Sequence, residues 1–180
     1  MAETTKYRSK ILDLIYELSN DKIILLQDII DIGSGDDPLL SGCDKFDLPV
    51  PYTEKCDKKL LTYVGDARHL TEVVKKKYKV VYSSHLLEDF GEDETIPVLK
   101  EWIKIIKNDG LLVILCPDQQ RYLEHCQRYD EKPNEHHRID RFSLEYIKSC
   151  LAKIPEINFL FGEELFDDGE YNFLCIAHRS

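Results

Sequence analysis

Apolar residues along this chain form two kinds of segment. Some recur every three or four positions, as in helices with one buried face, and others form short unbroken runs, as in strands buried on both faces. Because the two kinds alternate, we expect an α/β fold with a mostly parallel sheet that ends in an antiparallel hairpin. The pattern predicts helices over 6–19, 68–77, 97–107, 119–128 and 144–154, and strands over 25–32, 43–44, 60–64, 79–85, 111–116, 157–161 and 171–177.

The length of 180 residues fits one domain, spanning 1–180. Its N-terminal helix lies within 1–20, residues 45–59 are expected to form a loop, and a polar loop over 129–142 could fold over a substrate. Only eight residues separate Gly35 from Asp44. The first crossover of the sheet is therefore expected to be shortened, without a full helix.

The formal net charge of −10 argues against nucleic acid and anionic membranes as partners. The basic run over 75–77 is interpreted as the solvated end of a helix. No apolar run reaches the ~18 residues of a membrane span, and the N-terminus does not resemble a signal peptide. The cysteines show no C-x-x-C pair, so neither a metal site nor a disulfide framework is expected. These features favour a cytoplasmic protein, with a homodimer left open.

Polar side chains follow several of the predicted strands. In an open α/β sheet the carboxyl ends of the strands share one edge, where ligands bind. An acid at the end of the second strand can accept hydrogen bonds from ribose, and an acid beside a small residue can hold an adenine amine. The residues at these exits are Asp31, Asp44, Asp66 with Ala67, Ser83 with Ser84 and His85, and Asp118.

The turn Gly33-Ser34-Gly35 indicates the kind of ligand. Glycines let backbone N–H groups approach a ligand closely. The third glycine of a dinucleotide fingerprint is missing, and the acids Asp36 and Asp37 follow, which would repel a pyrophosphate. A cofactor with ribose and adenine but no phosphates suits this loop better. The alternatives are a turn without a ligand and a nicotinamide-dependent oxidoreductase, which the missing glycine disfavours.

Four segments, over 31–35, 65–67, 82–88 and 99–113, together resemble the class I S-adenosylmethionine-dependent methyltransferases. The resemblance is strongest to small members that act in sugar and surface-glycan biosynthesis. It implies a Rossmann-like class I methyltransferase sheet and S-adenosyl-L-methionine as the cofactor. Carried over by position, it assigns cofactor binding to Asp31, Gly33, Ser34, Gly35, Asp44, Asp66, Ala67, Arg68, Ser83 and Ser84.

Methyl transfer to a sugar hydroxyl needs a base, because an alcohol is a poor nucleophile. His85 is the first candidate for this base, Asp118 the second and His137 the third. For His85 the alternative is a helix-start residue bonded to backbone, and for His136 and His137 it is a solvated loop.

The acceptor side is assigned to residues 122–141. Two arginines could grip an anionic acceptor, such as the diphosphate of a nucleotide sugar, or could form surface ion pairs instead. The sequence thus predicts a methyltransferase for a small molecule, with O-methylation of a nucleotide-linked or glycan sugar as the leading function. The alternatives are transfer to nitrogen or to a protein side chain, and a non-catalytic module that binds the cofactor. The residues assigned to the acceptor are Tyr122, His136, Arg138 and Arg141.

Overall fold

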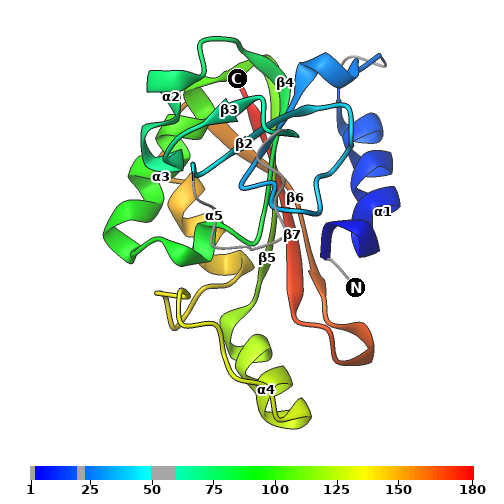
Figure 1. The fold of residues 1–180 in the computed structure, drawn as a ribbon, viewed down its shortest axis with the longest axis vertical. Helices are drawn as coiled ribbons and strands as arrows, with labels where there is room; N and C mark the ends of the chain where they lie inside the picture. Colours follow the sequence, from blue (N-terminus) through cyan, green and yellow to red (C-terminus); the bar gives the residue numbers. More distant parts are fainter. Residues whose placement is uncertain (1–2, 20–22, 50–59) are drawn as a thin grey trace.

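The computed structural model describes residues 3–19, 23–49 and 60–180, which build one seven-stranded sheet with helices on both faces (Figure 1). The strand order is β3-β2-β1-β4-β5-β7-β6. Strands β1 to β5 are parallel, and β7 runs antiparallel to both β5 and β6. The strands are β1 (Ile29–Ile32), β2 (Asp44–Asp47), β3 (Tyr63–Val64), β4 (Tyr78–Ser84), β5 (Ile106–Pro117), β6 (Ile157–Leu165) and β7 (Asn172–Arg179).

The central strands form because their residues are apolar on both faces. All four residues of β1 are buried, and β5 is buried from Gly110 to Pro117. In the register of the sheet, Ile30 pairs with Val81 of β4, and Val81 pairs with Leu112 of β5. The predicted mostly parallel sheet and its terminal antiparallel hairpin are confirmed.

Helices cover the two faces unequally. The helices are α1 (Glu3–Leu18), α2 (Leu70–Val73), α3 (Glu92–Lys104), α4 (Gln119–Tyr129) and α5 (Leu144–Leu151). Figure 1 shows α1 on one side of the sheet and α2, α3 and α5 on the other, with α4 extending beyond the strand ends near the β6–β7 turn. The indole of Trp102 in α3 is fully buried and donates a hydrogen bond to the Ala67 carbonyl at 3.1 Å. This bond fixes the segment after β3 against the sheet.

The second strand lies later in the sequence than predicted. It was expected to end at Asp44, but Asp44 is the first residue of β2, where its carboxylate accepts a hydrogen bond from the Tyr78 hydroxyl at 2.7 Å. Lys45 is not expected at a buried strand position. It is buried here because its ammonium group donates to the Ser41 carbonyl at 2.8 Å. The acid at the carboxyl end of β2 is therefore Asp47. The loop expected over 45–59 is wrong at 45–47, and its residues 50–59 lie outside the described part.

Other element boundaries differ by a few residues. Helix α3 begins at Glu92 rather than at Pro97, because the Glu94 carboxylate accepts a hydrogen bond from the Gly91 N–H at 3.0 Å and caps the helix. Strand β1 begins at Ile29 after a 3₁₀ turn over Leu26–Asp28. Within the described residues, no helix lies between β1 and β2, as the short connection predicted.

Candidate functional site

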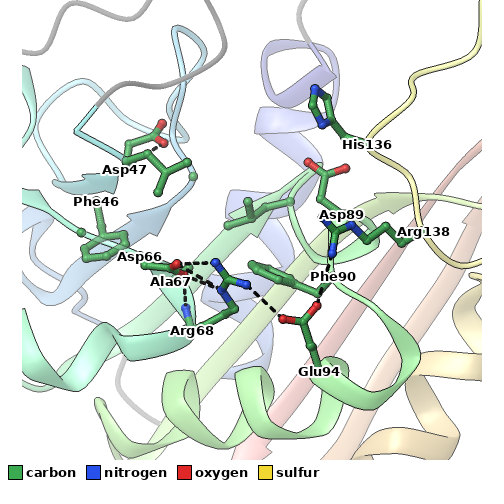
Figure 2. Close-up of a pocket in the computed structure, with 14 residues that line it drawn as sticks. Phe46, Asp47, Asp66, Ala67, Arg68, Asp89, Phe90, Glu94, His136 and Arg138 are labelled. Atoms are coloured by element: carbon green, nitrogen blue, oxygen red, sulfur yellow. Dashed lines mark hydrogen bonds and ion pairs between the residues drawn. The ribbon is translucent and has the colours of Figure 1, made fainter.

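Two cavities meet at the carboxyl edge of the sheet, and Gly33 lines both of them. We call them the Asp66 cavity, which Figure 2 shows, and the Asp31 cavity. The Asp66 cavity is lined by Gly33, Phe46, Asp47, Leu48, Gly65, Asp66, Ala67, Arg68, Leu86, Asp89, Phe90, Glu94, His136 and Arg138. The Asp31 cavity is lined by Glu3, Thr4, Asp31, Gly33, Ser34, Gly35, Asp36, Asp37, Ser84 and His85.

The glycine turn needs both of its glycines. Gly33 and Gly35 have φ angles of +73° and +49°, which favour residues without a Cβ atom. A Cβ on Gly33 would lie 2.7 Å from Leu86 Cδ2. The turn is held from β2, because Gly33 N donates to the Phe46 carbonyl at 2.8 Å and Gly35 N donates to Asp47 Oδ2 at 3.0 Å. The backbone of Gly33 therefore lines both cavities, with the Leu86 side chain packed against it.

Two buried polar atoms of the Asp31 cavity lack a partner. Asp31 is 1% exposed, and its Oδ2 accepts a hydrogen bond from Leu39 N at 2.7 Å. Its Oδ1 and the Ser34 hydroxyl have no hydrogen-bond partner in the described part of the molecule. Burial, with smaller contributions from Asp37 and Asp47, raises the pKa of the Asp31 carboxyl to about 7. Such a group favours a cationic or hydrogen-donating ligand, because leaving it unpaired is costly.

Ion pairs connect opposite walls of the Asp66 cavity (Figure 2). The Arg68 guanidinium donates to both oxygens of Asp66 and, at 3.1 Å, to Glu94 of α3. Arg138, from the loop after α4, lies 3.7 Å from the same glutamate. Hydrogen bonds from Arg68 hold the pKa of Asp66 below its usual range. The walls of this cavity are thus charged at one side and apolar at Phe46 and Phe90.

His85 leaves β4 in a strained conformation at the rim of the Asp31 cavity. Its φ is 49°, a left-handed angle that is uncommon for a residue with a side chain, and its N–H donates to the Leu115 carbonyl at 2.9 Å. The side chain is 25% exposed, with Nδ1 3.6 Å from Glu88 Oε1. In the described structure Nε2 is buried without a hydrogen-bond partner. Burial first, and then the neighbouring His137, lower the pKa of His85 to about 4, so the ring is neutral at pH 7.

His137 is buried beside the same glutamate. Its side chain is 5% exposed, its Nδ1 lies 2.8 Å from Gln119 Oε1, and its Nε2 lies 3.8 Å from Glu88 Oε1. The Tyr122 ring packs on it with 4.7 Å between centroids. Burial lowers the pKa of His137. The solvated-loop alternative is therefore wrong for this histidine, and the fold brings two of the three predicted bases together.

Several predicted site residues lie elsewhere. The Ser83 hydroxyl is buried inside the sheet and donates to the Ile32 carbonyl at 2.9 Å. Asp118 follows β5 as predicted, but its carboxylate caps α4 by accepting from Arg121 N at 3.1 Å. Arg141 forms a two-bond ion pair with Glu92, at 3.1 and 2.8 Å. Like Asp44, none of these three lines either cavity.

The remaining acceptor assignments divide between two places. His136 and Arg138 line the Asp66 cavity rather than the surroundings of His85. Tyr122 does lie on the His85 side, where its ring contacts Tyr171 with 5.2 Å between centroids. The Tyr171 ring lies 6.4 Å from that of His85.

Sequence reasoning missed four residues of the site. Asp47 was placed in a loop, and Glu88, Gln119 and Tyr171 were given no role. For Asp47 a signal existed, since it follows the only strongly apolar residue of β2, Phe46. For Glu88 the signal was its position three residues after His85, which brings the side chains together across one 3₁₀ turn.

Among the described residues, no three His, Cys, Asp or Glu side chains are arranged to hold a metal ion. None of the helices described is both long enough and apolar enough to cross a membrane.

Comparison with known proteins identifies the fold. The sequence matches no protein-family model and no curated protein. A solved S-adenosylmethionine-dependent methyltransferase from Clostridium acetobutylicum ATCC 824 superposes with a TM-score of 0.69 at 11% identity, over 99% of this chain and 93% of that one. The N-methyltransferase NodS from Bradyrhizobium japonicum WM9 gives 0.66 at 10% identity, over 97% and 95% of the two chains.

A third similar structure carries a ligand. Magnesium protoporphyrin IX methyltransferase from Synechocystis PCC 6803, solved with bound S-adenosylhomocysteine, superposes with a TM-score of 0.63 at 14% identity, over 98% of this chain and 83% of that one. The chain therefore has the class I methyltransferase fold that its sequence motifs predicted.

Proposed function

We propose that this protein is an S-adenosylmethionine-dependent methyltransferase acting on a small molecule. The observation that carries the proposal is the pair of buried, unpartnered atoms, Asp31 Oδ1 and Ser34 Oγ, at the rim of the glycine turn. They fit the ammonium group of a methionine moiety, which donates hydrogen bonds and carries positive charge. Gly33 lines both cavities, so a ligand that reaches from the Asp31 cavity to the Asp66 cavity would lie against its backbone.

The Asp66 cavity suits an adenosine group. Asp47, at the end of β2, is in place to accept hydrogen bonds from ribose hydroxyls, the role first assigned to Asp44. Phe46 and Phe90 supply apolar walls for a purine, while Asp66 and Ala67 offer a hydrogen-bond acceptor next to a small side chain. Four hydrogen-bond contacts from Arg68 already reach the Asp66 carboxylate, so an adenine amine would replace one of them.

His85 is the base of the proposed reaction. When bound, S-adenosylmethionine supplies an electrophilic methyl group, and the protein must position an acceptor oxygen and receive its proton. The His85 ring lies at the rim of the Asp31 cavity, and its neutral form can take that proton. His137 lies close enough to share in the proton transfer through Glu88.

A sugar linked to a nucleotide, or a sugar of a glycan, is the proposed acceptor. Tyr122 and Tyr171 give the His85 side aromatic faces on which a sugar ring can pack. A further cavity, between α4 and the β6–β7 turn, is lined by Arg121, Glu124, His125, Arg128, Phe166, Gly169 and Glu170. The His125 ring lies 4.8 Å from that of Tyr171. These basic groups, rather than Arg138 and Arg141, could bind the phosphates of a nucleotide sugar.

An amine acceptor is the second candidate. The lining of the Asp31 cavity includes the carboxyl groups of Glu3, Asp31, Asp36 and Asp37 but no lysine or arginine. This charge favours a cationic acceptor over an anionic one.

Incubation with S-adenosylmethionine and a panel of nucleotide sugars, neutral oligosaccharides and polyamines separates these acceptors. We expect one nucleotide sugar or oligosaccharide to gain the mass of one methylene group. A gain on polyamines alone would replace the O-methyl proposal with the N-methyl one. No gain on any acceptor, together with no binding of S-adenosylmethionine, would reject the methyltransferase proposal.

A further inference from the structure

Glu88 is a buried acid that lies between the two histidines of the candidate site. It lies in the 3₁₀ turn Leu87–Asp89 after β4 and is 1% exposed. In the described part of the chain its ion-pair contacts are to His85 and His137, not to lysine or arginine. A buried carboxyl without a permanently charged partner is costly for the fold, so its position calls for an explanation.

One oxygen of Glu88 faces two imidazole rings. Oε1 lies 3.6 Å from His85 Nδ1 and 3.8 Å from His137 Nε2. The other oxygen, Oε2, accepts a hydrogen bond from the Cys116 thiol at 3.3 Å. The backbone carbonyl of Glu88 accepts from Arg138 N at 3.0 Å, which anchors the loop that carries His137. The carboxyl therefore connects the exit of β4, strand β5 and this loop.

The orientations of the two histidine rings set the direction of proton flow. An amide oxygen only accepts, so His137 donates from Nδ1 to Gln119 Oε1, and its Nε2 presents a lone pair towards Glu88. His85 faces Glu88 with Nδ1, and its Nε2 is buried with no hydrogen-bond partner among the described residues. When His85 receives a proton, the Glu88 carboxyl can therefore pass its own proton to His137.

The charges around the cluster favour a neutral resting state. The groups that face it are Asp89 of the same turn, Cys116 of β5, and His136 beside His137. Burial, reinforced by Asp89, raises the pKa of Glu88 to about 8. Burial likewise lowers the pKa of both histidines. At pH 7 the mobile proton is thus on the carboxyl and both rings are neutral.

We propose that Glu88 is a positioning residue that holds His85 and His137 as one proton-accepting unit. The proposal rests on the proposed function. The acceptor O–H proton passes to the His85 ring, and the Glu88 proton passes to His137 Nε2, which leaves one carboxylate between two imidazolium rings. The acceptor oxygen forms its bond to the methyl carbon, and the electron pair of the broken C–S bond stays on sulfur. The net positive charge on the cluster equals the one proton received.

Nitrogen-detected NMR titration of the two imidazole rings tests this link without any substrate. In the wild-type chain we expect the ring shifts of both His85 and His137 to change together near pH 8, as Glu88 ionises. In E88Q the shared change should disappear from both rings, while the surface control E145Q should keep it. Independent titration of the two rings in the wild type, or an unchanged shared step in E88Q, would overturn the proposal.

A second variant guards against misfolding of E88Q. In H137Q the carboxyl remains, so His85 should still report its ionisation near pH 8; loss of that step would count against the link. Calorimetric binding of S-adenosylmethionine to each variant separates the two proposals. Normal binding with unlinked histidines would reject the role of Glu88 alone. Linked histidines without binding would reject the proposed function and leave the link itself in place.

Discussion

The backbone N–H of Gly35 donates a hydrogen bond to Asp47 Oδ2 at 3.0 Å, which ties the glycine turn to the end of β2. The same carboxylate accepts from Leu48 N through Oδ1 at 2.7 Å. Only eight residues lie between Gly35 and Asp44. This contact holds the end of the second strand beside the glycine turn without a crossover helix. It brings an acid of the second strand to the edge that the glycine turn occupies.

Asp47 should therefore matter for cofactor binding and Asp44 should not. We expect D47A to weaken the binding of S-adenosylmethionine by about tenfold or more, since hydrogen bonds to charged groups contribute about 1.5–3 kcal/mol. The matched control D44A removes an acid at the opposite end of the same strand, where it bonds to Tyr78. Calorimetry on both variants checks this, and equal losses of affinity would refute the assignment.

Gly33 should tolerate no side chain. G33A adds a Cβ at φ +73° and 2.7 Å from Leu86 Cδ2. We expect a loss of about 1–3 kcal/mol in the free energy of unfolding, from left-handed strain and overpacking together. Removing the Leu86 side chain should relieve the clash but not the backbone strain. We therefore expect G33A to cost less unfolding free energy in the L86A background than in the wild type. Equal losses in urea unfolding would show that the contact with Leu86 is not limiting.

The buried charge of Asp31 should lower the free energy of unfolding. Its pKa is raised to about 7, above the ordinary value near 3.9. The stability that its protonated form contributes is therefore fully present below pH ~4 and is lost as the pH rises through about 7. D31N keeps an acceptor for Leu39 N but cannot ionise. We expect it to exceed the wild type in unfolding free energy by about 1–3 kcal/mol at pH 8 and by less at pH 5. A difference independent of pH would contradict the buried charge.

Turnover measurements should distinguish His85 from Asp118 as the base. Once an acceptor is found, H85A should lower turnover by about a hundredfold or more, because a positioned general base contributes about that much. The affinity for S-adenosylmethionine should change little. D118N keeps the cap of α4, since asparagine caps as well as aspartate, and should retain turnover. If D118N lost turnover and H85A kept it, the base would be Asp118.

The local patterns predicted most of the elements, because helical spacing and apolar runs are properties of neighbouring residues. The cap of α5 at Ser143 is one such prediction, and its hydroxyl accepts from Tyr146 N at 3.2 Å. The extent of strand β2 was not predicted, because a lysine such as Lys45 usually lies on the surface. Its buried stem and its bond to Ser41 are set by the tertiary fold.

The candidate site was predictable where it follows strand ends and not where distant segments meet. Asp31, Ser34 and His85 were located from their position after apolar runs. The contact between Glu88 and His137 joins residues 49 positions apart, and no periodic pattern records such a pairing. The ion pairs of Arg141 with Glu92 and of Arg138 with Glu94 also join distant positions, so no local pattern indicates them.

The most direct test of the central claim is a calorimetric titration of the wild-type chain and D31N with S-adenosylmethionine, S-adenosylhomocysteine and NAD. The account predicts one site per chain for both sulfur-containing ligands, none for NAD, and a loss of about tenfold or more in affinity in D31N, because the charged acceptor for the ligand ammonium is gone. Absence of binding of either sulfur-containing ligand to the wild type, or binding that D31N leaves unchanged, would contradict it.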